Sequence, residues 1–130
     1  IVLTEFGYSR QAADVDNWLA ACRHVILKGA HGVRALGSGV MDLCYLACGR
    51  LDAAYAGVSG EGWKPWDYCA GSVILAEAGA YMCQCDGTPF DLYGSSVVAA
   101  SCEALADELV STLDQAADTQ FILVLRKRSK

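Results

Sequence analysis

Short apolar runs alternate with longer segments of helical periodicity along most of this chain, and this alternation constrains its fold more than any other feature. The predicted strands are 1–5, 33–36, 51–56, 80–85 and 96–100. The predicted helices are 14–28, 37–48, 66–78 and a final one that contains Leu105, Leu109 and Leu113. Strands that alternate with helices at this spacing predict an α/β domain, in which a mixed, largely parallel sheet is layered with helices.

Residues with strong local preferences mark the ends of these elements. Pro65-Trp66-Asp67 is typical of a helix start, and Gly79 ends the same helix. Ser101 is expected to cap the last helix. In the first helix, one apolar face is formed by Val15, Trp18, Leu19, Cys22 and Ile26. The run 121–125 is apolar enough for a strand but equally fits an ordered tail, and both interpretations stay open.

Composition and charge exclude several classes of protein. The chain has 130 residues, of which 54% are hydrophobic and 19% charged, so it can bury one core and is not expected to be disordered. Charged residues interrupt the richest apolar region, so no membrane-spanning segment is expected. The net charge is -5, although four of the ten basic residues lie within 126–130. Because an acidic body repels nucleic acid, we expect a soluble protein with no nucleic-acid or membrane partner.

The chain contains seven cysteines. Their number is odd and most of them have apolar neighbours, which does not favour a disulfide framework. Neither the pair Cys44 and Cys48 nor the pair Cys83 and Cys85 has the spacing of a structural zinc site. We therefore expect reduced thiols that act as small buried hydrophobes in a cytoplasmic protein.

The segment 64–71 places a carboxylate, Asp67, at the start of a helix whose next turn consists of small residues. Two roles fit this position. The carboxylate can cap the helix, which contributes about 0.5 to 2 kcal/mol, or it can be an oxygen ligand for Mg²⁺. We expect it to face a cleft shared with Gly37 to Gly39 rather than to fold back fully as a cap, because ligands gather at the carboxyl ends of strands in α/β sheets.

Gly37, Ser38 and Gly39 form a second candidate element, at a strand-to-helix junction. Their backbone N–H groups can bind an anion or a hydroxylated ligand, or the three residues can simply form a tight turn. Glu61 precedes Asp67 in a glycine-rich loop; it either reaches the same cleft or is a solvated loop carboxylate. Ser38 lacks the frame of a nucleophile elbow and no histidine is in triad spacing, so no catalytic residue is assigned.

A longer motif joins these candidates. The chain reads Trp66-Asp67-Tyr68-Cys69-Ala70-Gly71, then Val73-Ile74-Leu75, then Glu77-Ala78-Gly79-Ala80. This segment resembles the second signature of the inositol monophosphatase family, WDxAAGxxIxxEAGG. The resemblance continues through most of the chain, with all but about the last dozen residues covered, in the segments 3–7, 31–34, 37–39, 47–52, 87–92 and 97–100.

The resemblance implies a magnesium-dependent, lithium-sensitive phosphomonoesterase with an αβαβα layered fold, in which Mg²⁺ ions activate water for attack on phosphorus. The implied substrate is inositol monophosphate or a related sugar phosphate, and the implied assembly is a homodimer. Carried over by position, Asp67 is a metal ligand, and Gly37, Ser38 and Gly39 contact the sugar or cyclitol. Glu61 accepts a substrate hydroxyl, unless that family position falls on Ala56 instead.

The family's first signature, a DPxDGTxNF-like stretch, supplies most of the metal ligands and does not occur in these residues. We therefore expect residues 1–118 to be the C-terminal α/β domain of such an enzyme and 119–130 to be a C-terminal extension with a basic tail. The chain alone is expected to be inactive, with the N-terminal half of the same protein as its partner. Two alternatives stay open: a related phosphatase acting on a 3'-phosphoadenosine nucleotide, histidinol phosphate or galactose phosphate, and a non-catalytic binding or dimerisation module.

Overall fold

The computed structural model describes residues 1–128, with side chains described through Thr119. The strands are β1 (Val2–Thr4), β2 (Val33–Arg34), β3 (Ala53–Ala56), β4 (Tyr81–Cys83) and β5 (Val97–Ala100). The helices are α1 (Ala12–Leu27), α2 (Gly39–Ala47), α3 (Pro65–Glu77) and α4 (Glu103–Arg128). Each predicted strand and helix is present, and the observed strands are shorter than predicted. Within the described residues no helix has the length and hydropathy that a membrane crossing requires.

The strands form one sheet with the order β2-β1-β3-β5-β4. β1 pairs in parallel with both β2 and β3, whereas β5 pairs antiparallel with both β3 and β4. β5 is therefore the strand that runs against the other four. The prediction of a mixed, largely parallel sheet layered with helices is confirmed.

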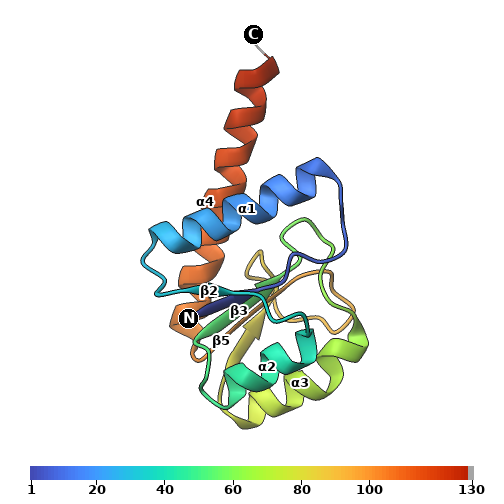
Figure 1. Cartoon of the computed structure of the whole chain (residues 1–130). Coiled ribbons are helices and arrows are strands. Elements are labelled where there is room, and N and C mark those ends of the chain that lie inside the picture. Colours follow the sequence, from blue (N-terminus) through green and yellow to red (C-terminus); the bar gives the residue numbers. More distant parts are fainter. Residues whose placement is uncertain (129–130) are drawn as a thin grey trace.

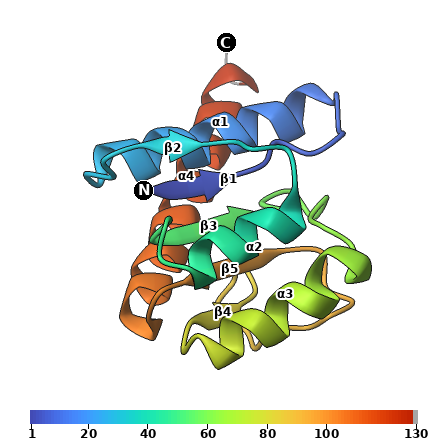
Figure 2. The same ribbon diagram turned by 60° about the horizontal axis from the view of Figure 1, so that its bottom comes forward.

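The helices cover both faces of the sheet. Figure 1 shows α1 and α4 crossing on one face and α2 and α3 side by side on the other, with the last turns of α4 projecting beyond the sheet. The turned view in Figure 2 shows the same three layers with the sheet in the middle. A parallel arrangement of β1, β2 and β3 brings their carboxyl ends to one edge, and the candidate residues must be sought there.

Alternation along the central strands divides the core into two halves. Tyr55 of β3 and Val98 of β5 face α1 and α4, while Ala54 and Val97, one position away, face α2 and α3. All four side chains are fully buried. Successive residues of a strand point to opposite faces, so this fully apolar pattern is that of strands buried on both sides.

Helix α3 ends as its sequence predicts. Gly79 has a φ of 76° and donates its N–H to the Ala76 carbonyl, and the N–H of Ala80 reaches back to the Leu75 carbonyl. These two bonds form a Schellman motif, which satisfies carbonyls that the helix end leaves free, and only glycine adopts that backbone conformation without strain.

The predicted apolar face of α1 coincides with its buried face only in part, since Trp18 and Cys22 are half-buried and contact Thr4 and Tyr55 of the sheet. Val15, Leu19 and Ile26 are exposed, whereas the smaller Ala21 and Val25 are buried against the sheet and α4. Close contact between α1 and α4 requires small side chains, and this overrides the hydrophobic periodicity of the sequence.

The C-terminal segment corrects two expectations. The backbone of 121–125 continues helix α4, so neither a strand nor a separate tail is present there; the side chains of this run lie outside the described ones. The helix begins at Glu103, so Cys102 and not Ser101 precedes its first residue. Both ends of α4 thus differ from the sequence-based assignment.

All seven cysteines are free thiols. Cys83 is buried, whereas Cys48, Cys69 and Cys102 are exposed. The expectation of small buried hydrophobes is therefore right for Cys83 and wrong for these three.

Candidate functional site

The carboxyl ends of β1, β2 and β3 meet at one edge of the sheet, and two side-chain contacts tie this edge together. Glu5 follows β1, and its Oε1 accepts hydrogen bonds from the N–H groups of Leu36 (2.7 Å) and Gly37 (2.8 Å), which follow β2. Glu5 was not among the functional residues predicted from the sequence. The signal available was a carboxylate placed directly after a strand.

The turn at 37–39 is shaped by its two glycines. Gly37 has a φ of 81°, a region that favours glycine. Gly39 opens α2 beneath the indole of Trp63, and a Cβ atom there would stand 2.7 Å from Cδ2 of that ring. Ser38 occupies the N-cap position without using its side chain as a cap. The hydroxyl of Ser38 therefore does not accept a hydrogen bond from the first N–H groups of α2.

Glu61 lies in the loop between β3 and α3, at the same edge of the sheet. Its side chain packs against Gly7, which follows β1; a Cβ on Gly7 would stand 3.4 Å from Cγ of Glu61. Its Oε2 is buried and has no hydrogen-bond partner among the described residues. Ala56, the alternative position, is the last residue of β3 and is buried. The loop therefore brings a carboxylate back to this edge.

Asp67 corrects the expectation about its orientation. It stands in the first turn of α3, and its Oδ2 accepts the N–H of Lys64 at 2.9 Å. The carboxylate thus folds back onto its own helix as a capping group, where the positive end of the helix dipole favours it. One oxygen thus folds back as a cap, contrary to the expected orientation, whereas a carboxylate fully used as a cap is not what the structure shows.

The loops before α2 and α3 are nevertheless in contact. The Trp63 ring that covers Gly39 also packs against Tyr68 of α3, with ring centroids 6.0 Å apart. Neither of the two described cavities is lined by a predicted site residue. The larger, of about 630 Å³, lies on the α1 and α4 side of the sheet beside Asn17, Val58 and Leu113.

Described residues alone do not make a metal centre. Within residues 1–119 no three histidine, cysteine, aspartate or glutamate side chains converge to hold an ion. Mg²⁺ needs several oxygen ligands in near-octahedral geometry, and Asp67 offers one carboxylate of which one oxygen already accepts a hydrogen bond. The chain by itself therefore does not fit a complete magnesium site.

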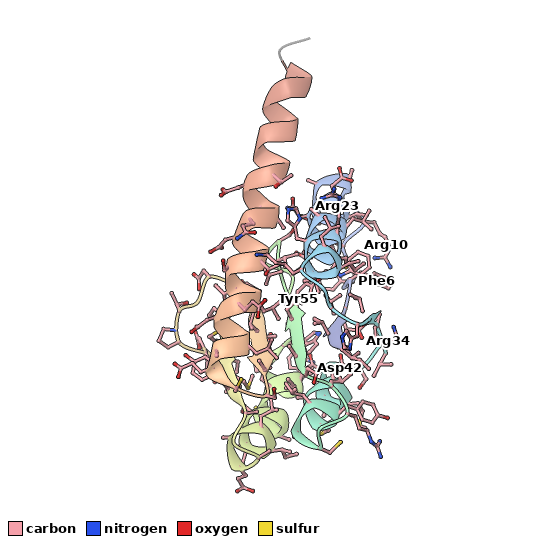
Figure 3. The ribbon with its side chains drawn as sticks, turned by 90° about the vertical axis from the view of Figure 1, so that its left-hand side faces the viewer. Phe6, Arg10, Arg23, Arg34, Asp42 and Tyr55 are labelled. Atoms are coloured by element: carbon pink, nitrogen blue, oxygen red, sulfur yellow. The ribbon has the colours of Figure 1, made fainter. Side chains whose placement is uncertain are left out.

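Asp42 is a second residue that the sequence analysis did not single out. It projects from α2 toward the sheet and is fully buried (Figure 3). Burial and the nearby Glu5 carboxylate raise the pKa of Asp42 to about 7. A buried carboxyl inside the apolar face of a helix has no reliable sequence signal, because aspartate in the first turn of a helix is ordinarily a solvated group.

These observations define an α/β layered domain that gathers backbone amides and carboxylates at the carboxyl ends of its parallel strands. A sequence model of the inositol monophosphatase family matches residues 1–118. The chain belongs to the inositol monophosphatase family.

Individual relatives agree with this assignment. Over 106 residues the chain is 40% identical to inositol monophosphatase 2 of Homo sapiens. The matched region covers 82% of this chain and 35% of the relative. It is 30% identical over 113 residues to inositol monophosphatase 1 of Sus scrofa, covering 87% and 39% respectively. The solved inositol monophosphatase from Anabaena (Nostoc) superposes with a TM-score of 0.70 at 30% identity, covering 88% of this chain and 42% of that one. The chain thus spans well under half the length of these relatives.

Proposed function

We propose that this chain is the C-terminal part of a Mg²⁺-dependent phosphatase that hydrolyses inositol monophosphate or a related sugar phosphate. The observation that carries this proposal is the match of residues 1–118 to the family. The geometry supports it, because the turn at 37–39, Glu61 and the loop before α3 all lie near one edge of the sheet. Inositol phosphate metabolism in the cytoplasm is the proposed setting.

Each candidate residue has a proposed role. The backbone of Gly37, Ser38 and Gly39 contacts the sugar or cyclitol, since the first N–H groups of a helix favour electron-rich ligands. Glu61 accepts a substrate hydroxyl through its unpartnered Oε2. Asp67 supplies one carboxylate oxygen to Mg²⁺ and uses the other to hold the start of α3. No catalytic residue is assigned within this chain.

The remaining ligands are proposed to come from the N-terminal half of the same protein. Two-metal phosphate chemistry would need several carboxylates to hold the two metal ions, which would stabilise the attacking and the leaving oxygen, and one aspartate cannot supply them. The outer face of α3 is a suitable docking surface for that half, because Trp66 is 75% exposed, Val73 57% and Ile74 43%. The assembled protein is proposed to be a homodimer.

Phosphate release tests the proposal. Expressed together with the residues that precede Ile1 in its gene, the protein should release phosphate from inositol 1-phosphate in the presence of Mg²⁺. The 130-residue chain alone should release none. Asp67→Asn should weaken the Mg²⁺ dependence in the longer protein, whereas Asp118→Asn, an exposed change on α4, should not.

Two outcomes would contradict this proposal. Robust Asp67-dependent phosphate release by the chain alone would show that its own residues complete the site. Failure of the longer protein to hydrolyse any phosphomonoester would favour a non-catalytic binding or dimerisation module. Activity confined to a 3'-phosphoadenosine nucleotide, histidinol phosphate or galactose phosphate would keep the reaction and change the substrate.

A further inference from the structure

The Glu5 carboxylate holds the entrance to the turn at 37–39. Its Oε1 accepts two backbone hydrogen bonds, from the N–H groups of Leu36 and Gly37, at 2.7 and 2.8 Å. Bonds from backbone N–H groups to an ionised carboxylate are shorter and stronger than those between neutral groups. The position of the turn relative to β1 therefore depends on where the Glu5 side chain points.

A second carboxyl group, that of Asp42, stands beside Glu5. Asp42 is 0% exposed, and neither of its carboxyl oxygens meets an N–H or O–H donor of the described residues. The Glu5 carboxyl group is the neighbouring charged group, and after burial it is the cause of the raised pKa of Asp42. Two ionised carboxylates repel each other and cannot form a hydrogen bond, so a bond between them requires one proton.

Other ionisable groups near α2 do not take the place of Glu5. α2 packs against α3, β3 and β5. The ionisable side chains of these elements are Asp67, Tyr68, Cys69 and Glu77 on α3 and Tyr55 on β3. Among the described residues, Glu5 is the charged group that acts on the Asp42 carboxyl, and no cation does so. The pair is thus not neutralised by a basic side chain.

We propose that the fully buried Asp42 carboxyl, which has no other partner among the described residues, donates a hydrogen bond to the Glu5 carboxylate, which in turn holds the turn that opens α2. Glu5 and Asp42 are then positioning residues for the Gly37–Gly39 turn. The importance of this turn for substrate rests on the proposed function, but the hydrogen bonds themselves do not.

A consequence is that the turn responds to pH. Burial and the Glu5 carboxylate raise the pKa of Asp42 to about 7, so the Asp42 carboxyl becomes ionised above neutrality. The Asp42 charge then lies in a fully buried position without a hydrogen-bond donor from the described part of the chain, and it repels the half-buried Glu5 carboxylate. Glu5 is displaced, and the N–H groups of Leu36 and Gly37 lose their acceptor.

Titration of the Asp42 carboxyl carbon by NMR in the 130-residue chain tests the shared proton. The expected midpoint lies near pH 7, and Glu5→Gln should lower it by at least about one unit, because the glutamine amide can donate to an ionised Asp42. Glu77→Gln is the matched control, since Glu77 is exposed on α3. A midpoint at the ordinary value of an aspartate in the unchanged chain would overturn the proposal.

Amide hydrogen exchange tests the positioning role. After correction for intrinsic base catalysis, exchange at Leu36 and Gly37 should accelerate about tenfold between pH 6 and pH 8.5. Asp42→Asn should abolish this acceleration, because its amide donates to Glu5 at every pH. In Glu5→Ala the amides of Leu36 and Gly37 should exchange fast at every pH. Glu5→Gln retains an acceptor and should restore their protection. Exchange that does not depend on pH in the unchanged chain, or unchanged protection in Glu5→Ala, would contradict the positioning role of Glu5 and Asp42.

These measurements do not depend on phosphatase activity. If the longer protein proves inactive while Asp42 titrates near pH 7 and Asp42→Asn flattens the exchange profile, the proposed function fails and the carboxyl pair stands. If the longer protein is active and the exchange is indifferent to both residues, the function stands and the pair fails.

Discussion

Gly39 lies directly beneath the indole ring of Trp63, and this contact joins the loop that opens α2 to the loop that precedes α3. Glycine is required there because the ring occupies the space of a side chain. The two loops carry most of the candidate substrate-binding residues. Their relative position is therefore fixed by an aromatic side chain that the sequence analysis did not single out.

Substitution of Gly39 tests this contact. Gly39→Ala should destabilise the chain by about 1 to 3 kcal/mol, because the added methyl group overpacks a filled space. In a double-mutant cycle with Trp63→Leu, the cost of Gly39→Ala should fall, since the smaller side chain makes room. Urea unfolding of the four proteins measures both effects. A Gly39→Ala chain as stable as the original would show that Trp63 moves aside freely.

Asp67 should stabilise the start of α3. Asp67→Ala removes the acceptor of the Lys64 N–H and should cost about 1 kcal/mol, whereas Asp67→Asn keeps an acceptor and should cost less. Thermal unfolding of the 130-residue chain measures the difference, with Glu77→Ala at the other end of α3 as the control. Equal melting temperatures for the alanine variant and the original would contradict the capping role.

The outer face of α3 should make the chain associate. An exposed apolar surface in the absence of its partner lowers solubility and binds apolar dyes. Replacement of Trp66 by Ser and Val73 by Asn should reduce both concentration-dependent light scattering and dye fluorescence. Tyr93→Ser is the control, because Tyr93 is 81% exposed and does not belong to α3. A monodisperse monomer at high concentration that binds no dye would contradict this prediction.

Stability should fall as pH rises, because of Asp42. In the native chain the pKa of Asp42 is raised from 3.8 to about 7, so between these values the native state binds more protons than the unfolded state. The contribution of Asp42 to the free energy of unfolding is fully present below about pH 4. It is lost as pH rises to about 7, and the loss is at most about 4 kcal/mol. Asp42→Asn should remove this pH dependence from the free energy of unfolding. If urea unfolding gives the same pH profile for the original chain and for Asp42→Asn, this prediction is wrong.

Much of the fold could be predicted from the sequence because local signals agreed with one another. Helix α3 has a proline at its start, a glycine after its end and small residues between, and each of these signals concerns neighbouring residues only. Strands β3 and β5 were predictable because residues buried on both faces give a continuous apolar run.

What failed depends on contacts between distant residues. The exposed face of α1, with Val15 and Leu19, could not be foreseen because α4 selects the smaller Ala21 side of the helix. The same holds at the candidate site. Glu5 and Asp42 are 37 positions apart in the sequence, and only the parallel pairing of β1 with β2 and β3 brings them together. The role of Asp67 as a metal ligand and the roles of Glu61 and the turn at 37–39 in substrate binding stay predictions.

The alternation along β3 also decides where this chain can change length during evolution. Loss of one residue within β3 would turn the Tyr55 phenol from the α1 and α4 layer into the α2 and α3 layer, where Ala54 now leaves room only for a methyl group. The loop 57–64 faces no such restriction, since it leaves the sheet before α3 begins. Gly57 and Gly62 of this loop pack tightly against the backbone of Ser95, so a change in length fits at its exposed tip, Gly60. A carboxylate delivered next to that tip can be repositioned for a new substrate while both halves of the core stay intact.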